Sequence, residues 1–363
     1  QARALSIQKK SAAIMNVLAA DAIGKLPDRN AAEAVQRIQG VSIERDHGEG
    51  RYVSVRGAPL KWNSNLINGN RLPAAVGTSD GLGTGSDRSV PLDIFPSELI
   101  QYVQLSKAIT PDMEGDAIGG SVNFITRTAP YERTLNVNLA GGYNNQAVDG
   151  RYDASLLYGD RFFNDKLGII ISGAAWERNW GTDNYEVGYN ADLEDPNQQF
   201  SVSQLELRDY LGKRSTLGLN VGAEYNFNDD HKIFFRGIST SFEDDERSRE
   251  FLFLFNEDAA QIRQRKAIWG TYLSGGEFGG EHQLTEKTSL SWKGATYRTK
   301  ANLGSTPTPN PDEGAGLLLG IFRQQNVGFQ GLSPDGYKYL EGDAPQGVAG
   351  DPFNNIQPNM ANP

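Results

Sequence analysis

The sequence contains no cysteine, which excludes disulfide bridges and thiolate metal sites. This absence leaves the compartment open, because envelope proteins and cytoplasmic proteins can both lack cysteine. Histidine is scarce as well. His47, His231 and His282 are far apart in the sequence, so no histidine metal motif is present and each is predicted to be an ordinary surface residue.

Long apolar runs are also missing. The longest strongly apolar stretch, LGIIISGAAW at residues 167–176, falls short of the roughly 20 residues that a membrane-spanning helix needs. A strand of a membrane barrel needs only about 10 residues with every second one apolar, so a membrane role stays open. The chain has no basic stripe and a net charge of -10, which argues against a nucleic-acid partner.

The 363 residues include 41 glycines, and the length predicts two or more domains or one large β structure. Residues 9–22, KKSAAIMNVLAADA, partly imitate a signal peptide. Asn16 interrupts the apolar part, and eight residues precede the two lysines. We therefore expect the chain to begin inside a mature protein.

Residues 1–130 have the pattern of a compact α/β unit. Asn30 and Glu33 form a capping pair that predicts a helix start within residues 26–40, and Gly40 is expected to end this helix. Further signals are a strand at 51–57, a hairpin turn at Asn68-Gly69, a mobile loop at 77–88, and a helical turn that enters a strand at 96–108.

The pattern changes near Tyr131. Residues 216–227, TLGLNVGAEYNF, alternate between an apolar face that begins at Leu217 and a polar face that includes Asn220 and Glu224. This alternation predicts an antiparallel sheet with one apolar and one polar face. Residues 134–143, 151–159 and 166–176 show the same pattern less clearly, and further strands are expected near 232–242, 265–284 and 288–300.

The connections between these strands alternate in length. Tight turns are expected at 163–166, 228–231 and 285–288, and long polar loops near 178–205, 246–262 and from 301 onward. Such alternation is typical of outer-membrane barrels. Aromatic residues near the strand ends fit interfacial girdles: Tyr158, Phe162, Phe163, Trp176, Trp180, Tyr225, Phe227 and Trp292. A soluble β-sandwich or propeller remains an alternative, since its strands alternate too.

Two stretches carry a resemblance to a known family. Residues 23–57, IGKLPDRNAAEAVQRIQGVSIERDHGEGRYVSVRG, and residues 96–127, PSELIQYVQLSKAITPDMEGDAIGGSVNFITR, resemble the plug domain of TonB-dependent outer-membrane receptors. Together they cover roughly half of the plug. The amino-acid sequence of these stretches is most similar to the large receptor branch of Caulobacter- and Xanthomonas-like bacteria, which is linked to the uptake of carbohydrate as well as iron.

The resemblance implies a membrane β-barrel of 22 strands with an N-terminal α/β plug in its lumen. Residues 1–130 would be the plug and residues 131–363 the leading part of the barrel, with about seven strands. The implied function is TonB-dependent uptake of a large nutrient across the outer membrane, without enzyme activity or a cofactor. The implied partners are TonB with ExbB and ExbD, outer-membrane lipid and the ligand, with a surface lipoprotein as a further candidate.

The segment PDMEGDAIGGSVNF, residues 111–124, would be the last strand of the plug sheet. We expect Gly119 and Gly120 to let the backbone approach the sheet or the barrel wall closely, and Val122, Phe124 and Ile125 to fill the plug core. A calcium loop on Asp112, Glu114 and Asp116 is the competing interpretation. It fails because Gly does not follow Asp116 and Asn123 stands where the last acidic ligand belongs.

The family also suggests a contact that locks the plug to the barrel. Arg56, followed by Gly57 in the VRG motif, matches a plug arginine that faces barrel acids, and Glu224 is its expected partner. Because the lumen face is polar, we expect rearrangeable charge pairs rather than apolar contacts to hold the plug. A TonB box should lie upstream of Gln1, and the seven strands predict that the chain is a part of a longer receptor.

The substrate is left with two interpretations. The outer plug loops are expected at residues 58–65 and 77–88. Trp62 beside Asn63 and Asn65 favours sugar rings, and an oligosaccharide or similar nutrient is our first expectation. Lys61, Arg71 and Arg88 could instead meet an anionic ferric siderophore.

Two other classes of function stay open. A β-rich secreted hydrolase could use the acids of FEDDER, residues 242–247, although their expected place at a strand end favours solvated charge. A receptor-like barrel with a scaffold or assembly role is the third class.

Overall fold

The structure is a computed structural model of the chain. It describes residues 2–11, 14–20, 29–74, 89–108, 110–111, 113, 115, 117–190, 201–303 and 317–325. The predicted loop at 77–88 and the acids Asp112, Glu114 and Asp116 lie outside the described residues.

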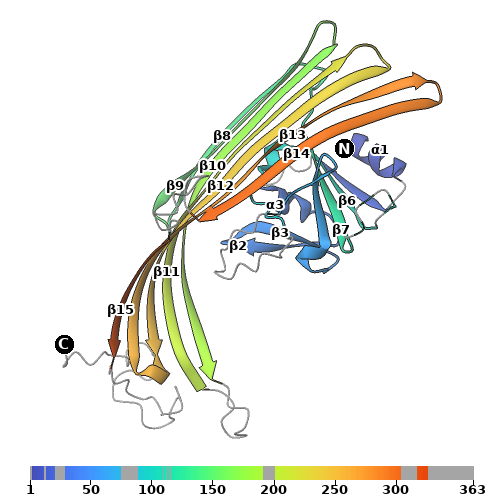
Figure 1. The fold of residues 1–363 in the computed structure, drawn as a ribbon. Coiled ribbons are helices and arrows are strands. Elements are labelled where there is room, and N and C mark those ends of the chain that lie inside the picture. Colours follow the sequence, from blue (N-terminus) through green and yellow to red (C-terminus); the bar gives the residue numbers. More distant parts are fainter. Residues whose placement is uncertain are drawn as a thin grey trace.

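The described residues from 2 to 126 form an α/β unit, which we call the N-terminal unit (Figure 1). Its five-stranded sheet has the order β1-β6-β7-β4-β5, in which only β4 and β7 run parallel. The strands are β1 (Met15–Ala19), β4 (Asn63–Ile67), β5 (Asn70–Arg71), β6 (Ile100–Ser106) and β7 (Gly120–Thr126). A separate hairpin and the helical segments complete the unit: β2 (Val41–Asp46), β3 (Glu49–Val55), α1 (Ala2–Lys10), α3 (Ala31–Val35), η1 (Leu60–Trp62) and η2 (Ser97–Leu99).

Helix α3 begins where the capping pair predicts. The side chain of Asn30 accepts a hydrogen bond of 3.1 Å from the backbone N–H of Glu33, and the Glu33 carboxylate accepts one of 3.0 Å from the N–H of Arg29. The helix is shorter than expected, because turns replace it after Val35 and continue to Gly40, where φ is +83°.

The hairpin turn and the helical turn predicted for this unit are also confirmed. Asn68 and Gly69 both have positive φ, +49° and +77°, in the turn between β4 and β5. The short helix η2 leads directly into β6, as the pattern at 96–108 predicts. Residues 15–19, which partly imitate a signal peptide, form β1 at the edge of the sheet.

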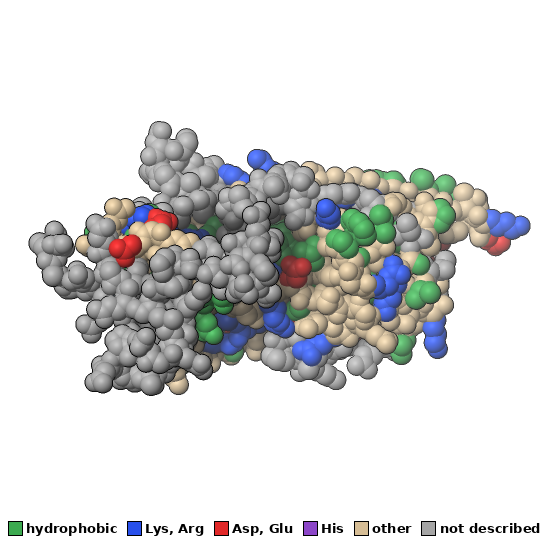
Figure 2. All heavy atoms as spheres, turned by 90° about the horizontal axis from the view of Figure 1, so that it is seen from below, with side chains coloured by type: hydrophobic (Ala, Val, Ile, Leu, Met, Phe, Trp, Pro, Cys, Tyr) green, Lys and Arg blue, Asp and Glu red, His purple; other side chains and the backbone are tan. Residues whose placement is uncertain are grey.

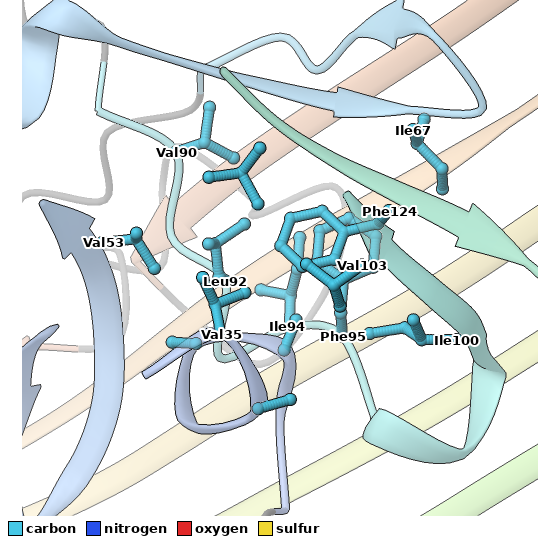
Figure 3. Packing of buried hydrophobic residues seen from close by; sticks show 14 of the residues in the cluster. Val35, Val53, Ile67, Val90, Leu92, Ile94, Phe95, Ile100, Val103 and Phe124 are labelled. Atoms are coloured by element: carbon cyan, nitrogen blue, oxygen red, sulfur yellow. The ribbon is translucent and has the colours of Figure 1, made fainter. Parts of the chain in front are cut away.

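The core of the unit packs α3 and the 90–95 segment against the sheet (Figure 3). The rings of Phe95 and Phe124 stack with centroids 6.2 Å apart. Val122 and Phe124 point into this core, as expected, and are at most 1% exposed. Ile125 is only half-buried, because alternation along β7 turns it to the other face.

The glycine pair before β7 allows a close approach within the N-terminal unit itself. A Cβ atom on Gly119 would lie 2.3 Å from Oδ1 of Asn63 and 2.8 Å from Cβ of Ala58. A Cβ atom on Gly120 would lie 2.9 Å from Cγ1 of Val55 and 3.0 Å from the carbonyl of Ser106. Backbone and side chains of the neighbouring strands, and not the barrel wall, therefore require the two glycines.

An eight-stranded antiparallel sheet, which we call the large sheet, follows the N-terminal unit (Figure 1). Its order is β14-β13-β12-β11-β10-β9-β8, and β15 continues the β14 edge along the remaining length of β13. The strands are β8 (Thr134–Asn144), β9 (Asp149–Phe162), β10 (Leu167–Asn190), β11 (Ser201–Asn226), β12 (His231–Leu254), β13 (Ala259–Thr285), β14 (Thr288–Leu303) and β15 (Leu317–Gln325).

The predicted tight turns lie together at one end of the large sheet, which we call the turn end. They span 163–166, 227–230 and 286–287 and lie at the top of Figure 1. The N-terminal unit lies beside the half of the sheet nearer this end (Figure 1). We call the opposite end the loop end. The sheet face turned to the N-terminal unit is the inner face, and the other is the outer face.

The predicted alternation of β11 is confirmed. Leu217 and Leu219 on the outer face are 59% and 45% exposed, whereas Thr216 and Asn220 on the inner face are buried. The outer face of β8 is equally apolar, with Leu135, Val137 and Leu139 exposed. Exposed aliphatic side chains on one face of several strands are what a lipid-facing surface requires.

Two of the predicted long loops are wrong. Residues 178–190, 201–205, 246–254 and 259–262 belong to strands, and β12 and β13 are joined by the short helix η3 (Phe255–Glu257) and Asp258. The FEDDER acids therefore lie within the 24-residue strand β12 and not at a strand end. Both faces are polar here, so the alternation that reveals a half-buried strand disappears.

The aromatic prediction is wrong for two residues. Phe163, Phe227 and Trp292 are exposed near the turn end, in keeping with a girdle. Trp176 and Trp180 are only 4% and 5% exposed, because they point to the inner face.

Apolar contacts between the N-terminal unit and the large sheet also correct an expectation. Four inner-face residues belong to the same buried apolar cluster as the core of the N-terminal unit: Trp176, Ile238, Phe242 and Leu273. The interface is thus partly apolar, although the polar lumen face predicts only polar contacts. In the part of the chain that the structure describes, no helix is long and apolar enough to cross a membrane.

Candidate functional site

Two hairpins of the N-terminal unit bind ionic groups on the inner face of the large sheet. The turn between β2 and β3 contacts the middle of strands β10, β11 and β12. The β4–β5 hairpin contacts β13 and β14 nearer the turn end, and a residue of β12 supports this contact. We call these contacts the mid-strand anchor (Asp46, His47, Glu49, Arg178, Arg214, Asp244, Glu246) and the turn-end anchor (Asn68, Asn70, Arg236, Glu277, Lys293).

Arg214 is the centre of the mid-strand anchor. Its side chain is fully buried, and its Nη2 lies 2.7 Å from Oδ2 of Asp46 and 2.7 Å from Oδ2 of Asp244. Its Nη1 also donates to the backbone carbonyl of Asp46 at 2.7 Å. One guanidinium therefore joins an acid of the N-terminal unit to an acid of β12, as the planar fork of arginine allows.

The surroundings of Arg214 ionise Asp46 and fix the hydrogen bonds of His47. Burial alone would raise the pKa of Asp46, but Arg214, His47 and Arg51 outweigh it and hold this pKa below its usual value. Nη2 of Arg214 lies 2.6 Å from Nδ1 of His47. Because arginine can only donate, Nδ1 accepts this bond in the neutral ring, whose Nε2 proton then faces Glu246 at 3.3 Å. The His47 ring also stacks on Trp180, with centroids 4.1 Å apart.

Glu49 extends this anchor across the turn. Its carboxylate lies 2.8 Å from Nε of Arg178 and 3.5 Å from both Arg214 and Arg29. The side chain is only 2% exposed. Three cations thus surround one buried acid and offset part of the loss of its hydration, although burial still raises the pKa of Glu49.

The side chains of Asp46, His47 and Asp244 approach each other closely enough for metal ligands, within 4.8 Å. The Arg214 guanidinium already lies among them, at 2.7 Å from both carboxylates. A metal ion would have to displace this buried cation and leave it unpaired. The arrangement therefore does not fit a metal site.

The turn-end anchor is built around Glu277, whose side chain is fully buried. Its carboxylate accepts hydrogen bonds from Asn70 Nδ2 at 2.6 Å and from Arg236 Nη1 at 2.8 Å. Nζ of Lys293 lies 3.5 Å from the same carboxylate and donates to the carbonyl of Asn68 at 2.9 Å. The β4–β5 hairpin is thus held by groups from β13 and β14, and Arg236 of β12 supports the carboxylate of Glu277.

A cavity of about 350 Å³ adjoins the mid-strand anchor. Its aromatic lining consists of Tyr52, Tyr210, Phe242 and Trp269, and its charged lining of Glu44, Arg45, Asp46, His47, Arg51, Asp244, Glu246 and Arg265. Arg265 lies over the Trp269 ring, 5.3 Å from its centroid. Aromatic faces beside carboxylates and arginines suit a bulky ligand with rings and hydroxyl groups.

Asp93 lies behind the mid-strand anchor, and its burial predicts that the stability of the folded state depends on pH. It is 1% exposed, and burial raises its pKa to about 7 although Arg51, at 3.6 Å, opposes the shift. Between about pH 4 and this value the folded state holds a proton that the unfolded chain releases, so stability falls as the pH rises. We expect Asp93→Asn to remove this slope, which is at most about 1.4 kcal/mol per pH unit.

Amide hydrogen exchange of β6 and β7 at pH 4.5 and 7.5 measures this effect. Glu132→Gln, which changes an exposed carboxyl, is the matched control and should keep the slope of the unchanged protein. Equal slopes in the Asp93→Asn variant and the unchanged protein would contradict the assignment.

The predicted lock between Arg56 and Glu224 is corrected by the structure. Arg56 donates to the carbonyl of Gly119 at 2.9 Å and of Ile118 at 3.3 Å, and so joins the turn after β3 to the start of β7. Glu224 pairs instead with Arg161 of the neighbouring β9–β10 hairpin. Arg56 and Gly57 both have positive φ, which closes a tight turn that keeps the Arg56 side chain over its own sheet.

The predicted ligand residues are not brought together at the cavity. Asn63 and Asn65 are each 5% exposed, and Asn63 donates to backbone carbonyls of its own unit. Lys61, Trp62 and Arg71 are exposed but do not line the cavity. Arg88 lies outside the described residues.

The residues of the two anchors are not predicted from the sequence, although the sequence contains a signal for Arg214. Side chains alternate between the two faces of a strand, and Arg214 is an even number of residues from Thr216 and Asn220. The polar face of β11 therefore continues to Arg214, which places this side chain on the inner face.

Comparison with known proteins gives the chain a family. Residues 7–121 match the family described as TonB-dependent Receptor Plug Domain. The chain is 28% identical over 174 residues to the vitamin B12 transporter BtuB of Photobacterium profundum, which covers 48% of this chain and 24% of that protein.

Similar solved structures include the siderophore receptor PirA from Acinetobacter baumannii, with a TM-score of 0.40, 12% identity, and coverage of 82% of this chain and 59% of that one. Another is FpvA of Pseudomonas aeruginosa bound to heterologous pyoverdines, with a TM-score of 0.43, 11% identity, and coverage of 81% and 43%. The chain thus spans less than two thirds of the length of these proteins. From the plug match we conclude that residues 7–121 are the plug domain of a TonB-dependent receptor of the outer membrane, a family of receptors and transporters rather than enzymes, and the antiparallel sheet with an apolar outer face that follows them fits the barrel of this family.

Proposed function

We propose that this chain is the leading part of a transporter that takes up a large nutrient, in which the N-terminal unit blocks the barrel lumen until TonB moves it. The observation that carries this proposal is the pair of anchors. Ion pairs at the β2–β3 hairpin, and hydrogen bonds to charged side chains at the β4–β5 hairpin, hold the N-terminal unit to the inner face. Such contacts can be exchanged for others without unfolding either part, as a movable plug requires.

We place the domain boundary near residue 130, between the end of β7 at Thr126 and the start of β8 at Thr134. Residues 131–363 would be the leading part of a barrel of about 22 strands. The turn end would face the periplasm and the loop end the exterior. TonB, with ExbB and ExbD, would act through a TonB box upstream of Gln1, and β1 at the sheet edge offers a place for strand addition.

The cavity beside the mid-strand anchor supports a ligand with rings. Tyr52 of the N-terminal unit and Tyr210 and Trp269 of the large sheet line it together. We propose an oligosaccharide or a similar nutrient as the first candidate. The names of the relatives favour a second candidate, a metal chelate such as a corrinoid or a ferric siderophore, which Arg265 and Arg45 could meet by charge.

Calorimetric titration of the complete receptor in detergent tests this function. Oligosaccharides, cobalamin and ferric siderophores form the panel, and Trp269→Ala is compared with Trp62→Ala, an exposed tryptophan outside the cavity. We expect one class to bind with micromolar or tighter affinity, and only Trp269→Ala to weaken it about tenfold or more. Equal loss in both variants, or binding by none of the classes, would contradict the proposed site.

A further inference from the structure

Two of the three histidines of the chain lie side by side at the turn end of the large sheet. Register pairs His231, the first residue of β12, with His282 of β13, and their ring centroids are 5.4 Å apart. Both side chains point to the outer face, because each is an even number of residues from an exposed phenylalanine of that face, Phe235 or Phe278. Antiparallel pairing thus creates a histidine pair that the distance between the two residues in the sequence conceals.

The backbone hydrogen bonds bring the two imidazoles as close as an antiparallel sheet allows. The N–H of Gln283 donates to the carbonyl of Asp230 at 2.7 Å, so these two residues form the hydrogen-bonded pair of the ladder. His231 and His282 are therefore the adjacent non-hydrogen-bonded pair, in which side chains lie closest. Two imidazoles that bind one tetrahedral ion, each with a metal–nitrogen distance of about 2.1 Å, have ring centroids roughly 5 Å apart. The observed spacing of 5.4 Å fits such a pair.

The ring nitrogens of the pair are available to an ion. Nδ1 of His231 is buried and has no hydrogen-bond partner among the described residues. Nε2 of His282 accepts a hydrogen bond of 3.1 Å from Nε1 of Trp292, and Gly280 leaves room for it, since a Cβ atom there would lie 2.8 Å from both nitrogens. Whichever nitrogen of His282 holds an ion, this bond is lost, because an ion on Nδ1 leaves the proton on Nε2. Trp292 is 41% exposed, so water can replace the histidine as its acceptor.

The described residues offer few competing ligands for an ion that prefers nitrogen or sulfur. The chain has no cysteine. Nδ1 of His47, the third histidine, already lies 2.6 Å from the Arg214 guanidinium in the mid-strand anchor. Seen from below, hydrophobic and basic side chains are in view, and acidic ones are fewer (Figure 2). The pair of His231 and His282 therefore provides the most suitable described ligands.

We propose that His231 and His282 bind a divalent transition-metal ion of the zinc, nickel or copper type. Neutral imidazole is a preferred ligand of these ions, whereas calcium and magnesium ions require oxygen ligands. Two side chains leave the remaining positions of the ion to water, so we expect a dissociation constant in the micromolar range. The ion joins the first residue of β12 to β13 and holds the two strands together at the turn end. The proposal does not depend on the nutrient, on TonB or on the two anchors.

Calorimetric titration of the complete receptor with zinc chloride and nickel chloride tests the site. The receptor is purified in detergent without a histidine tag. We expect a micromolar binding component that His231→Asn and His282→Asn each weaken at least about tenfold, since even an outer-shell partner of a metal ligand contributes that much. The matched control is Glu281→Gln, which changes the neighbouring carboxylate on the inner face and should leave this component unchanged.

Trp292→Phe separates a metal site from a merely structural contact. It removes the competing N–H donor, so the ion should bind about fivefold more tightly, which corresponds to the net contribution of one hydrogen bond. Amide exchange gives a second measurement. Zinc at about a hundred times its dissociation constant should slow exchange at the start of β12 and the end of β13 by up to about a hundredfold, but not in the two histidine variants.

Heat-modifiable migration on a gel verifies that all variants are folded. The proposal is overturned if the unchanged receptor lacks the micromolar component, if only one of the two histidine variants weakens it, or if Glu281→Gln weakens it as much as they do. Weaker binding by Trp292→Phe than by the unchanged receptor would also overturn it, because the ion would then not compete with the bond between His282 and Trp292.

Discussion

Replacing Arg214 by alanine is expected to destabilise the docked N-terminal unit by about 3–5 kcal/mol, since it leaves buried acids without their cation. Asp46 and Asp244 both lie 2.7 Å from the Arg214 guanidinium, and Asp244 is only 4% exposed. Without the guanidinium, each must ionise beside the other or take up a proton. Chemical unfolding followed by the fluorescence of Trp180, which stacks on His47, measures the loss.

The preceding residue gives a matched control. Lys213 lies on the outer face, is half-exposed and pairs with Glu177 at 2.6 Å, so Lys213→Ala should cost no more than about 1 kcal/mol. Arg214→Lys keeps the charge but not the fork that reaches two carboxylates, and an intermediate loss is expected. Similar losses for Lys213→Ala and Arg214→Ala would show that the mid-strand anchor does not hold the N-terminal unit.

A strand can be predicted from the sequence where its two faces lie in environments of different polarity. Residues 216–227 alternate because lipid or solvent on one side and the lumen on the other impose opposite polarities, and the structure confirms the alternation there. Residues 243–250, EDDERSRE, continue a strand but are polar on both faces. Hydrophobic periodicity carries no information where neither face is apolar, so the sequence pattern predicts a loop for this part of β12.

The anchors could not be predicted because they depend on docking between distant segments. Arg214 and Asp46 are 168 residues apart. The alternation of side chains along β11 places Arg214 on the inner face, but only the position of the β2–β3 hairpin determines its partners. The failed pairing of Arg56 and Glu224 has the same origin. A turn of two residues with positive φ directs Arg56 to carbonyls of its own unit, and the β9–β10 hairpin supplies a nearer cation for Glu224.

Glu277→Ala is expected to release the β4–β5 hairpin from the large sheet, with a loss of about 3–5 kcal/mol. The Glu277 carboxylate is fully buried and accepts hydrogen bonds from Asn70 and Arg236 while Lys293 lies 3.5 Å away. Its removal leaves two cations facing each other without an anion. Hydrogen exchange of the β4 and β5 amides, which reports the opening of this hairpin directly, should speed up by two orders of magnitude or more.

Glu281→Ala on the same strand is the control, because Glu281 is exposed and, among the described residues, pairs with Lys232 alone, at 2.8 Å. Its effect should stay within about 1 kcal/mol. Loss of one anchor and loss of the other should also have opposite effects on the two hairpins. Glu277→Ala should free β4 and β5 while β2 and β3 remain protected, and Arg214→Ala should do the reverse. If either change exposes both hairpins together, the anchors act as one cooperative unit, and a plug that opens at one hairpin before the other is excluded.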